Sequence, residues 1–387
     1  MNTYAVCLWP RGSLASELGS DTLFGAVCWA IRDLGLTDVE ALLEGFNTRP
    51  RFAFSSTFPI LRVKGQNGNG PPEAQVRFYP RPLLPGLSPQ QVDTLAEEKQ
   101  GHEPHLSSKA AKVRGVGTAK QLKEIMYLSE DLFTEMVRGQ TNTEGLFRRF
   151  TSRGSRSQDV EPAGDALITY DERRRLQRSG ILRPFIEYEA VQHNQIDRVA
   201  GSTAEGLLFF EQETFFRAGG GLWCVLRAEA DDVERLIRPA FRYLTDTGLG
   251  ANRTTGKGHF HIEIDGNPLE LPHADDPNAF VTLSRYLPQN EEWLPDRGPL
   301  HYMLLNLWPK REQRFVRPMP GQHTPPVRKR RIRMFAPGSI FPLAERQCIY
   351  GRLAKVVPAG EGGHTVWQSG LAVPVFARLG TEEGGVR

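Results

Sequence analysis

Apolar and polar positions alternate at the start of the chain in the pattern of a half-buried strand. Tyr4, Val6 and Leu8 lie on one face of this pattern, which has the two-residue period of β-structure. Apolar residues then recur at helical spacing from 23 to 34, and Gly35 ends that run. The chain is therefore predicted to open with a strand followed by a helix.

The same two periodicities return in the middle of the chain. Residues 185–198 read "FIEYEAVQHNQIDR" and residues 206–229 read "GLLFFEQETFFRAGGGLWCVLRAE", and both segments predict strands. Apolar positions from 233 to 244 share one helical face, and alternation resumes from 260 to 264. This half of the chain is predicted to contain two strands, a helix and a last strand.

The stretch from about 51 to 180 differs from its surroundings, because it is rich first in proline and then in arginine. We interpret it as an insertion with a short helix of its own near 121–138. Without it, the order is strand, helix, strand, strand, helix, strand, which is that of a ferredoxin-like (RRM-like) domain.

We therefore predict an α+β fold with two ferredoxin-like domains. The first spans residues 1–268 with its insertion, and the second, degenerate one spans 277–387. The strands expected in the second domain lie near 279–283, 302–307, 330–335 and 371–377.

A glycine-rich loop joins the predicted helix to the last strand of the first domain, in the sequence "TDTGLGANRTTGKGHFHIEI" from 245 to 264. Its spacing fits neither the Walker motif nor the dinucleotide fingerprint. Both of those loops also leave a strand and open a helix, whereas this one has the reverse order. A flexible, solvated turn is the alternative interpretation of such a loop.

Glycines allow backbone N–H groups to approach a phosphodiester closely, while cations neutralise its charge and hydroxyl and amide groups donate hydrogen bonds. We expect Arg198 to lie near the same end of the sheet as the loop. The predicted RNA-binding residues are therefore Arg198, Gly248, Gly250, Asn252, Arg253, Thr254, Thr255, Gly256, Lys257 and Gly258.

The composition is that of a globular protein, with 387 residues, 39% hydrophobic residues, 24% charged residues and a formal net charge of +3. Its four cysteines form no C-x-x-C pair, which argues against structural zinc and a disulfide framework. No apolar run reaches the roughly 18 residues of a membrane span. We expect a cytoplasmic protein with no membrane association.

The positive charge is concentrated in two runs. Residues 310–333 hold nine basic side chains against the single acid Glu312, and an arginine-rich tract extends from Arg148 to Arg178. Such runs are often solvated faces, but two of them beside a glycine-rich loop favour a polyanionic partner. The first run supplies a predicted RNA or subunit interface that consists of Arg328, Lys329, Arg330, Arg331 and Arg333.

Five stretches of the chain resemble the RAMP superfamily of CRISPR proteins, and within it the fourth-subunit family of the type III-A (Csm) effector complex. They are "SDTLFGAVCWAI" from 20, "NQIDRVAGSTAEGLLF" from 194, "DTGLGANRTTGKGHFHI" from 246, "RRIRMFAPGSIF" from 330 and "GLAVPVFARL" from 370. The chain departs from the family at Ala251, where a second glycine is common, and at Lys257, where an aromatic residue is common. Ala251 argues against a left-handed backbone at that position.

The resemblance implies a non-catalytic subunit that binds the 5′ tag of the CRISPR RNA (crRNA). It also implies contacts with a large subunit that has polymerase-like domains, with a repeated RAMP backbone subunit and, indirectly, with target RNA. A thumb-like hairpin near the guide is a further implication, and we expect it in the tract from Arg148 to Arg178.

A metal-independent RAMP endoribonuclease that processes CRISPR RNA is the enzymatic alternative, because such cleavage commonly uses a histidine as general base. No histidine precedes His102, although His259 and His261 share a strand face beside the loop. His102 and His105 are too close together for the helical metal motif, and Pro104 breaks the helix. We expect no catalytic residue, no metal and no cofactor.

Overall fold

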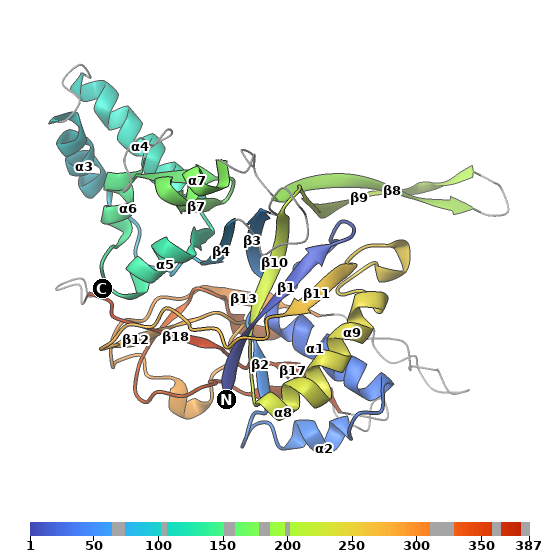
Figure 1. Ribbon diagram of the computed structural model, residues 1–387. Coiled ribbons are helices and arrows are strands. Elements are labelled where there is room, and N and C mark those ends of the chain that lie inside the picture. Colours follow the sequence, from blue (N-terminus) through green and yellow to red (C-terminus); the bar gives the residue numbers. More distant parts are fainter. Residues whose placement is uncertain are drawn as a thin grey trace.

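The computed structural model describes residues 1–63, 74–101, 107–150, 159–177, 186–197, 202–309, 329–357 and 365–380 (Figure 1). Its largest element is a nine-stranded mixed sheet with the order β11-β1-β10-β3-β4-β5-β7-β6, and β2 also pairs with β10. The strands are β1 (Asn2–Pro10), β2 (Phe52–Phe54), β3 (Phe58–Val63), β4 (Ala74–Pro80), β5 (Tyr127–Ser129), β6 (Val160–Ala163), β7 (Ala166–Thr169), β10 (Gly220–Ala228) and β11 (Phe260–Ile264).

Strand β10 lies at the centre of the core. All nine of its residues are buried, and β1 on one side and β2 and β3 on the other pair with it antiparallel. Helix α1 (Ser20–Asp33) packs beside α9 (Arg238–Thr247), which continues α8 (Ala230–Asp232) and the π-helical turn η1 (Val233–Ile237). The two helices bury Leu23, Val27, Ile31 and, from α9, Phe241 and Leu244, as their apolar spacing predicts.

Residues 52–63, which we expected within the insertion, form β2 and β3 and pair with the central strand β10. The elements β1, α1, β3, β10, α9 and β11 follow one another along the chain in the order strand, helix, strand, strand, helix, strand, with other elements between them. The second strand of this order is β3 and not the segment 185–198. Phe52, Phe54 and Phe58 are buried there, and the prolines that suggested extended insertion begin only at Pro59.

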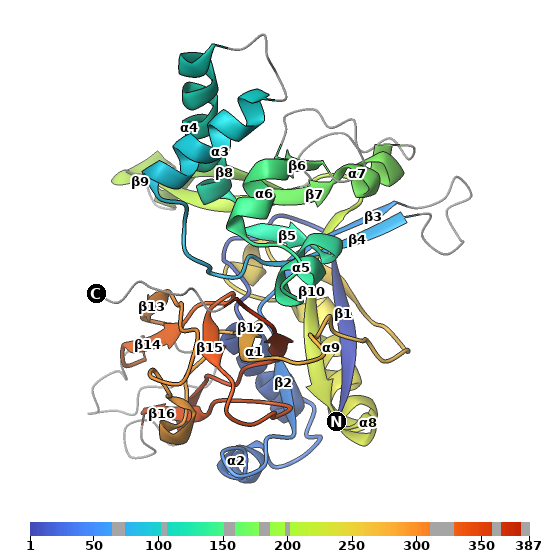
Figure 2. The ribbon, with the colours of Figure 1, turned by 90° about the vertical axis from the view of Figure 1, so that its left-hand side faces the viewer.

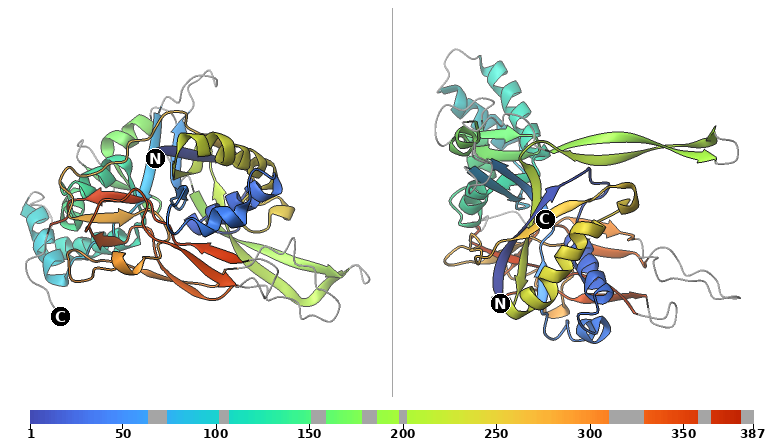
Figure 3. Two further views of the ribbon diagram at one scale, coloured as in Figure 1. Left: turned by 90° about the horizontal axis from the view of Figure 1, so that it is seen from below. Right: turned by 45° about the vertical axis from the view of Figure 1, so that its right-hand side comes forward.

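The segment 186–216 is a separate antiparallel hairpin rather than part of the large sheet. Its strands β8 (Ile186–Asp197) and β9 (Ser202–Phe216) pair with each other, and β9 also forms a bridge with the segment after β1 through Thr214 and Leu14. The hairpin projects far from the body (Figures 1 and 3). Alternating residues fit any strand with two different faces, so the pattern alone did not separate a projecting hairpin from a sheet strand.

The tract in which a thumb-like hairpin was expected contains the short antiparallel hairpin of β6 and β7. The described residues of the tract from Arg148 to Arg178 form the end of α6 (Thr143–Arg149), the strands β6 and β7, and α7 (Tyr170–Gln177). The strands β6 and β7 form one edge of the large sheet. The helices α6 and α7 lie near that edge, together with α5 (Glu130–Val137) and the helix pair α3 (Pro89–Gly101) and α4 (Ser108–Glu124) (Figure 2). The single short helix expected near 121–138 is the end of α4 followed by α5.

The four strands expected in the C-terminal part are all present, as β12 (Ala279–Thr282), β13 (Leu304–Leu307), β14 (Ile332–Phe335) and β18 (Pro374–Ala377). β12 is central in a sheet with β18 and β15 (Ile340–Pro342), and β13 and β14 form a ribbon, as do β16 (Leu353–Val357) and β17 (Val366–Ser369). The core here is aromatic: the rings of Phe280 and Tyr350 stack with centroids 4.3 Å apart.

The remaining helices are short, namely α2 (Val39–Glu44) and the 3₁₀ turns η2 (Arg253–Thr255) and η3 (Asn290–Glu292). Within the residues described, no helix is both long enough and apolar enough to cross a membrane.

Candidate nucleic-acid interface

The glycine-rich loop begins where α9 ends. Gly248 caps the helix with φ 79°, and Gly250, Gly256 and Gly258 also have positive φ angles of 82°, 86° and 67°. Glycine adopts this region without the steric penalty that a Cβ imposes. The predicted C-cap and the predicted junction of a helix with a following strand are therefore confirmed.

Ala251 has no left-handed backbone, as the sequence indicated. The left-handed residue is instead Asn252, with φ 57°, the only non-glycine with positive φ among the described residues. Asparagine tolerates this region better than most residues. Alanine at position 251, where a second glycine is common in the family, therefore causes no backbone strain.

The loop is closed on itself and fixed to the segment that follows β1. The N–H of Leu249 donates to the carbonyl oxygen of Gly258 at 2.8 Å, and the N–H of Gly258 donates to that of Ser13, also at 2.8 Å. The N–H of Ala251 donates to Ser16 Oγ at 3.2 Å. Residues 250–256 between these anchors remain largely exposed.

The root of the β8–β9 hairpin holds the other side of the loop. Lys257 Nζ lies 2.6 Å from Glu213 Oε2 and 3.0 Å from Ser13 Oγ, and Asn252 Nδ2 donates to Glu211 at 2.7 Å. Ser13 Oγ also donates to Glu213 Oε2 at 2.6 Å. Three segments far apart in the sequence therefore meet at one junction.

Glu213 is the buried centre of this junction, because its side chain is 0% exposed while that of Lys257 is 22% exposed. Burial by itself raises the pKa of a carboxyl, but hydrogen bonds from Lys257 and Ser13 outweigh it and hold the pKa of Glu213 below its usual range. His193 Nε2 faces the second oxygen at 3.3 Å. The carboxylate is thus kept ionised and paired.

This pairing changes the role expected of Lys257, since its charge is compensated by Glu213. Arg253 is half-buried in η2, while Thr254 and Thr255 are exposed, and Thr255 Oγ1 donates to the carbonyl oxygen of Asn252 at 2.8 Å. The structure therefore brings nine of the ten predicted RNA-binding residues into one loop. The tenth, Arg198, lies outside the described residues.

Sequence reasoning missed Ser13, His193, Glu211 and Glu213. Glu211 and Glu213 stand two positions apart in "FFEQETFF", so they share one strand face between aromatic residues. A repeated acid in such a strand is the signal that could have indicated a cationic partner nearby.

A cavity of about 280 Å³ adjoins this junction, between the segment after β1 and the hairpin root. Ser16, Tyr127, Tyr188 and Gln212 are among its lining residues. Tyr188 donates its hydroxyl to Asp165 at 3.2 Å, which fixes its ring at the cavity wall. Aromatic faces beside an amide are suited to holding a planar ligand with polar edges.

The two histidines beside the loop have different neighbours. His259 Nε2–H donates to the carbonyl oxygen of Arg253 at 3.2 Å, and His261 lies 3.3 Å from Glu263 on the outer strand β11. Within the described ranges, no group of three or more histidine, cysteine or acidic side chains is placed to hold a metal ion. His102 and His105 lie outside those ranges.

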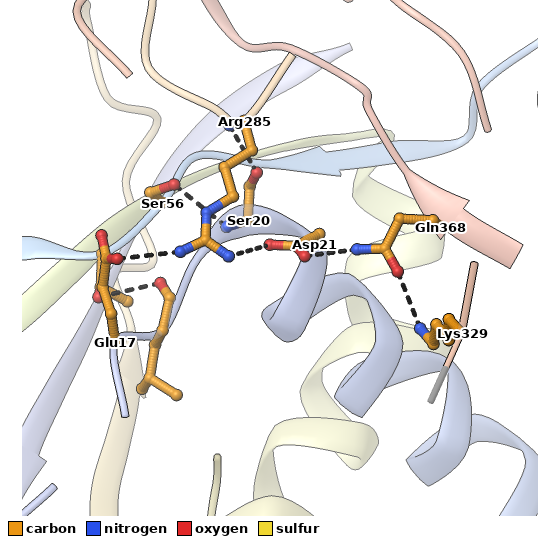
Figure 4. A network of polar contacts seen from close by, with 9 residues as sticks. Glu17, Ser20, Asp21, Ser56, Arg285, Lys329 and Gln368 are labelled. Carbon is orange, nitrogen blue, oxygen red and sulfur yellow. Dashed lines mark hydrogen bonds and ion pairs between the residues drawn. The ribbon is translucent and has the colours of Figure 1, made fainter. Parts of the chain in front are cut away.

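The predicted basic interface divides into an inward and an outward part, and Arg328 lies outside the described residues. Lys329 Nζ donates to Gln368 at 2.9 Å, and Gln368 in turn donates to Asp21 at the first turn of α1 (Figure 4). Arg330, Arg331 and Arg333 are exposed instead.

Figure 4 shows that the same network joins the N-terminal sheet region to the C-terminal part. Arg285 donates to Asp21 at 3.0 Å and to Glu17 at 2.9 Å, and its backbone N–H donates to Ser20 Oγ at 2.9 Å. The side chains of Arg285 and Asp21 are only 12% and 5% exposed. Lys329 therefore serves this internal network.

Comparison with known proteins decides which family these features belong to, although no protein-family model matches the chain. The CRISPR system Cms protein Csm4 of Thermococcus onnurineus (strain NA1) is 25% identical over 289 residues, which are 73% of this chain and 74% of that protein. The chain is a Csm4 homologue. This confirms the resemblance to the fourth-subunit family of the type III-A effector.

Two solved structures share the fold of this Csm4 homologue. A chain of the Csm3–Csm4 subcomplex in the type III-A CRISPR–Cas interference complex has a TM-score of 0.59 and 14% identity, with 97% of this chain and 99% of that chain covered. A chain of the Csm1–Csm4 cassette in complex with cA4 has a TM-score of 0.54 and 19% identity, with 99% and 100% covered. The mixed α+β architecture with its large sheet is thus shared along almost the whole chain.

Proposed function

We propose that the chain is a non-catalytic crRNA-binding subunit of a type III-A CRISPR interference complex. In this proposal it holds the 5′ tag of the crRNA and links the large subunit to the backbone filament, for antiviral defence in the cytoplasm. The observation that carries the proposal is the exposed glycine-rich loop fixed to the root of a projecting hairpin.

The loop is suited to a sugar-phosphate backbone rather than to a mononucleotide. Its exposed residues include Gly256, which has no side chain, and the hydroxyl and amide groups of Asn252, Thr254 and Thr255. The half-buried Arg253 adds a cation. Backbone groups and arginine contact phosphate and sugar without reading the bases. The loop is therefore assigned to the backbone of the tag.

The hairpin adds a surface for bases. Phe209 and Phe210 are 48% and 64% exposed on β9, and the His193 ring stacks on Phe209 with centroids 5.4 Å apart. Exposed aromatic rings are the platforms on which single-stranded RNA bases stack. The thumb-like element of the proposal is thus the β8–β9 hairpin.

The strand order supports the proposed ferredoxin-like first domain. β11-β1-β10 and then β2 and β3 form four adjacent antiparallel positions, and α1 and α9 lie together beside them. We propose domains at 1–268 and 277–387, with the inserted layer of α3 to α7 beginning after β3 rather than near 51. The second domain keeps four of its expected strands.

The proposal is tested by binding of the purified full-length chain to a fluorescent RNA that carries the repeat-derived 5′ tag, in EDTA. We expect tighter binding than to the same RNA without its tag, and the RNA should stay intact because the proposed subunit is non-catalytic. Specific cleavage that is lost in His259→Ala would overturn this proposal in favour of the endoribonuclease alternative. Equal affinity for both RNAs would show that the chain does not recognise the 5′ tag.

A further inference from the structure

An acidic side chain of the hairpin root occupies a hydrogen-bond donor of the glycine-rich loop. Asn252 Nδ2 donates to Glu211 Oε2 at 2.7 Å, Asn252 is exposed, and the side chain of Glu211 is 40% exposed. The phosphodiester of RNA presents the same kind of acceptor as a carboxylate, namely an anionic oxygen. A phosphate and the Glu211 carboxylate therefore compete for one amide donor.

The backbone of Asn252 is fixed by bonds that do not involve Glu211. The carbonyl oxygen of Asn252 accepts from the N–H groups of Thr255 at 3.1 Å and Lys257 at 3.3 Å. It also accepts from Thr255 Oγ1 at 2.8 Å. The left-handed turn at Asn252 is thus held within the loop, and only the side-chain amide depends on the hairpin.

The two anions cannot share the Asn252 amide. Like charges within hydrogen-bonding distance of the same donor repel each other near a protein surface. Lys257, the cation of the loop at this junction, does not relieve that repulsion, because its Nζ is paired with Glu213 Oε2 at 2.6 Å. An RNA phosphate that reaches Asn252 therefore has to displace the Glu211 carboxylate.

A second neighbour for the displaced carboxylate lies on the hairpin itself. His193 Nε2 is 3.9 Å from Glu211 Oε2, and the His193 ring stacks on Phe209 with centroids 5.4 Å apart. A rotation of the Glu211 side chain away from the loop leaves the carboxylate beside this imidazole. The hairpin root can thus release Asn252 without isolating the charge of Glu211.

We propose that Glu211 is an electrostatic gate on the glycine-rich loop. In the RNA-free chain its carboxylate occupies the donor of Asn252, and an RNA phosphate binds there only by displacing it. This inference rests on the proposed function, because it takes the loop as the holder of the RNA backbone. It adds the regulation of that site: the loop is released only to an anion that further contacts hold in place, as the phosphates of a polynucleotide are held.

The experiment measures the affinity of the purified full-length chain for the fluorescent tag RNA at physiological ionic strength. In Glu211→Thr we expect the affinity to rise about fivefold, because binding no longer breaks a hydrogen bond to a carboxylate. Threonine is too short to reach Asn252 and is well suited to a strand position.

The matched control is Glu189→Thr, which removes the same charge from an exposed position on β8, directly opposite Glu213 in the register of the hairpin. Glu189 forms no hydrogen bond or ion pair with the described residues of the loop. Its substitution should therefore change the affinity by less than about twofold, since salt screens a charge that makes no direct contact.

A double-mutant cycle tests whether the effect of Glu211 passes through Asn252. Asn252→Gly tolerates the left-handed backbone and removes the amide, so Glu211→Thr should no longer strengthen RNA binding in that background. An equal gain in both backgrounds would overturn the proposal, because Glu211 would then act only as a nearby negative charge. Weaker binding in Glu211→Thr alone would also overturn it, since the contact would then prepare the loop for RNA.

Failure of the gate differs from failure of the proposed function. Equal affinity for tagged and untagged RNA would contradict tag binding, but the gain in Glu211→Thr would still be measurable with either RNA. A gain no larger than that of Glu189→Thr, with the preference for tagged RNA retained, would overturn the gate alone. Absence of RNA binding in every variant and in the unsubstituted chain would overturn both.

Discussion

Replacing Gly258 by alanine is expected to open the glycine-rich loop and to remove most of its RNA affinity. Gly258 has φ 67°, and an added Cβ would overlap the carbonyl oxygen of Leu249 and lie 3.1 Å from its carbonyl carbon. The N–H of Leu249 donates to the Gly258 carbonyl, so the clash falls on the contact that closes the loop. We expect a loss of about 3 kcal/mol in the free energy of unfolding, from clash and backbone strain together.

Gly256 supplies the matched control for this substitution. Its φ of 86° imposes the same kind of left-handed strain, but an added Cβ would meet nothing within 4 Å. Gly256→Ala should therefore cost only about 1–2 kcal/mol. Urea unfolding of both variants measures the difference, and equal losses would show that Leu249 does not constrain the loop.

Replacing Glu213 by leucine is the other substitution with a large expected effect. It leaves Lys257, which is only 22% exposed, without its carboxylate and releases the loop from the hairpin root. Breaking such a buried pair by removing one partner is expected to lower the free energy of unfolding by about 3 kcal/mol. Adding Lys257→Met to Glu213→Leu should recover part of that loss, because the unpaired charge is removed as well.

Glu211→Leu is the control, since Glu211 is 40% exposed and accepts its hydrogen bond from Asn252, which is exposed as well. Its expected loss is below about 1 kcal/mol. The pKa of Glu213 is lowered in the folded chain, so its stabilisation is present above the ordinary value of 4.5 and is lost as the pH falls further. The difference between Glu213→Leu and the unsubstituted chain should therefore shrink in acid. A loss in Glu213→Leu no larger than that in Glu211→Leu would contradict this account of the junction.

The elements with strong local signals could be predicted from the sequence. Gly248 as a helix C-cap, the strand at 260–264 and the apolar face of the helix before them all follow from periodicity and glycine position. These signals depend on neighbouring residues only. They placed the glycine-rich loop correctly between a helix and a strand.

The pairing of distant segments could not be predicted in the same way. The pattern of β8 and β9 is that of an ordinary strand, and nothing local indicates that these strands leave the sheet. Lys257 looked like a free cation because its partner Glu213 lies 44 residues away. Arg331 and Trp308 were likewise separated by residues that gave no sign of their contact.

The salt dependence of tag-RNA affinity in Arg253→Ala tests the central claim most directly. Each phosphate contact contributes about 0.7 to the slope of log affinity against log salt for single-stranded RNA. We expect Arg253→Ala to flatten the slope by about 0.7. Arg235→Ala, which removes an exposed arginine of η1, should leave it unchanged. If the two variants keep the same slope, the glycine-rich loop does not hold the RNA backbone and the account is wrong.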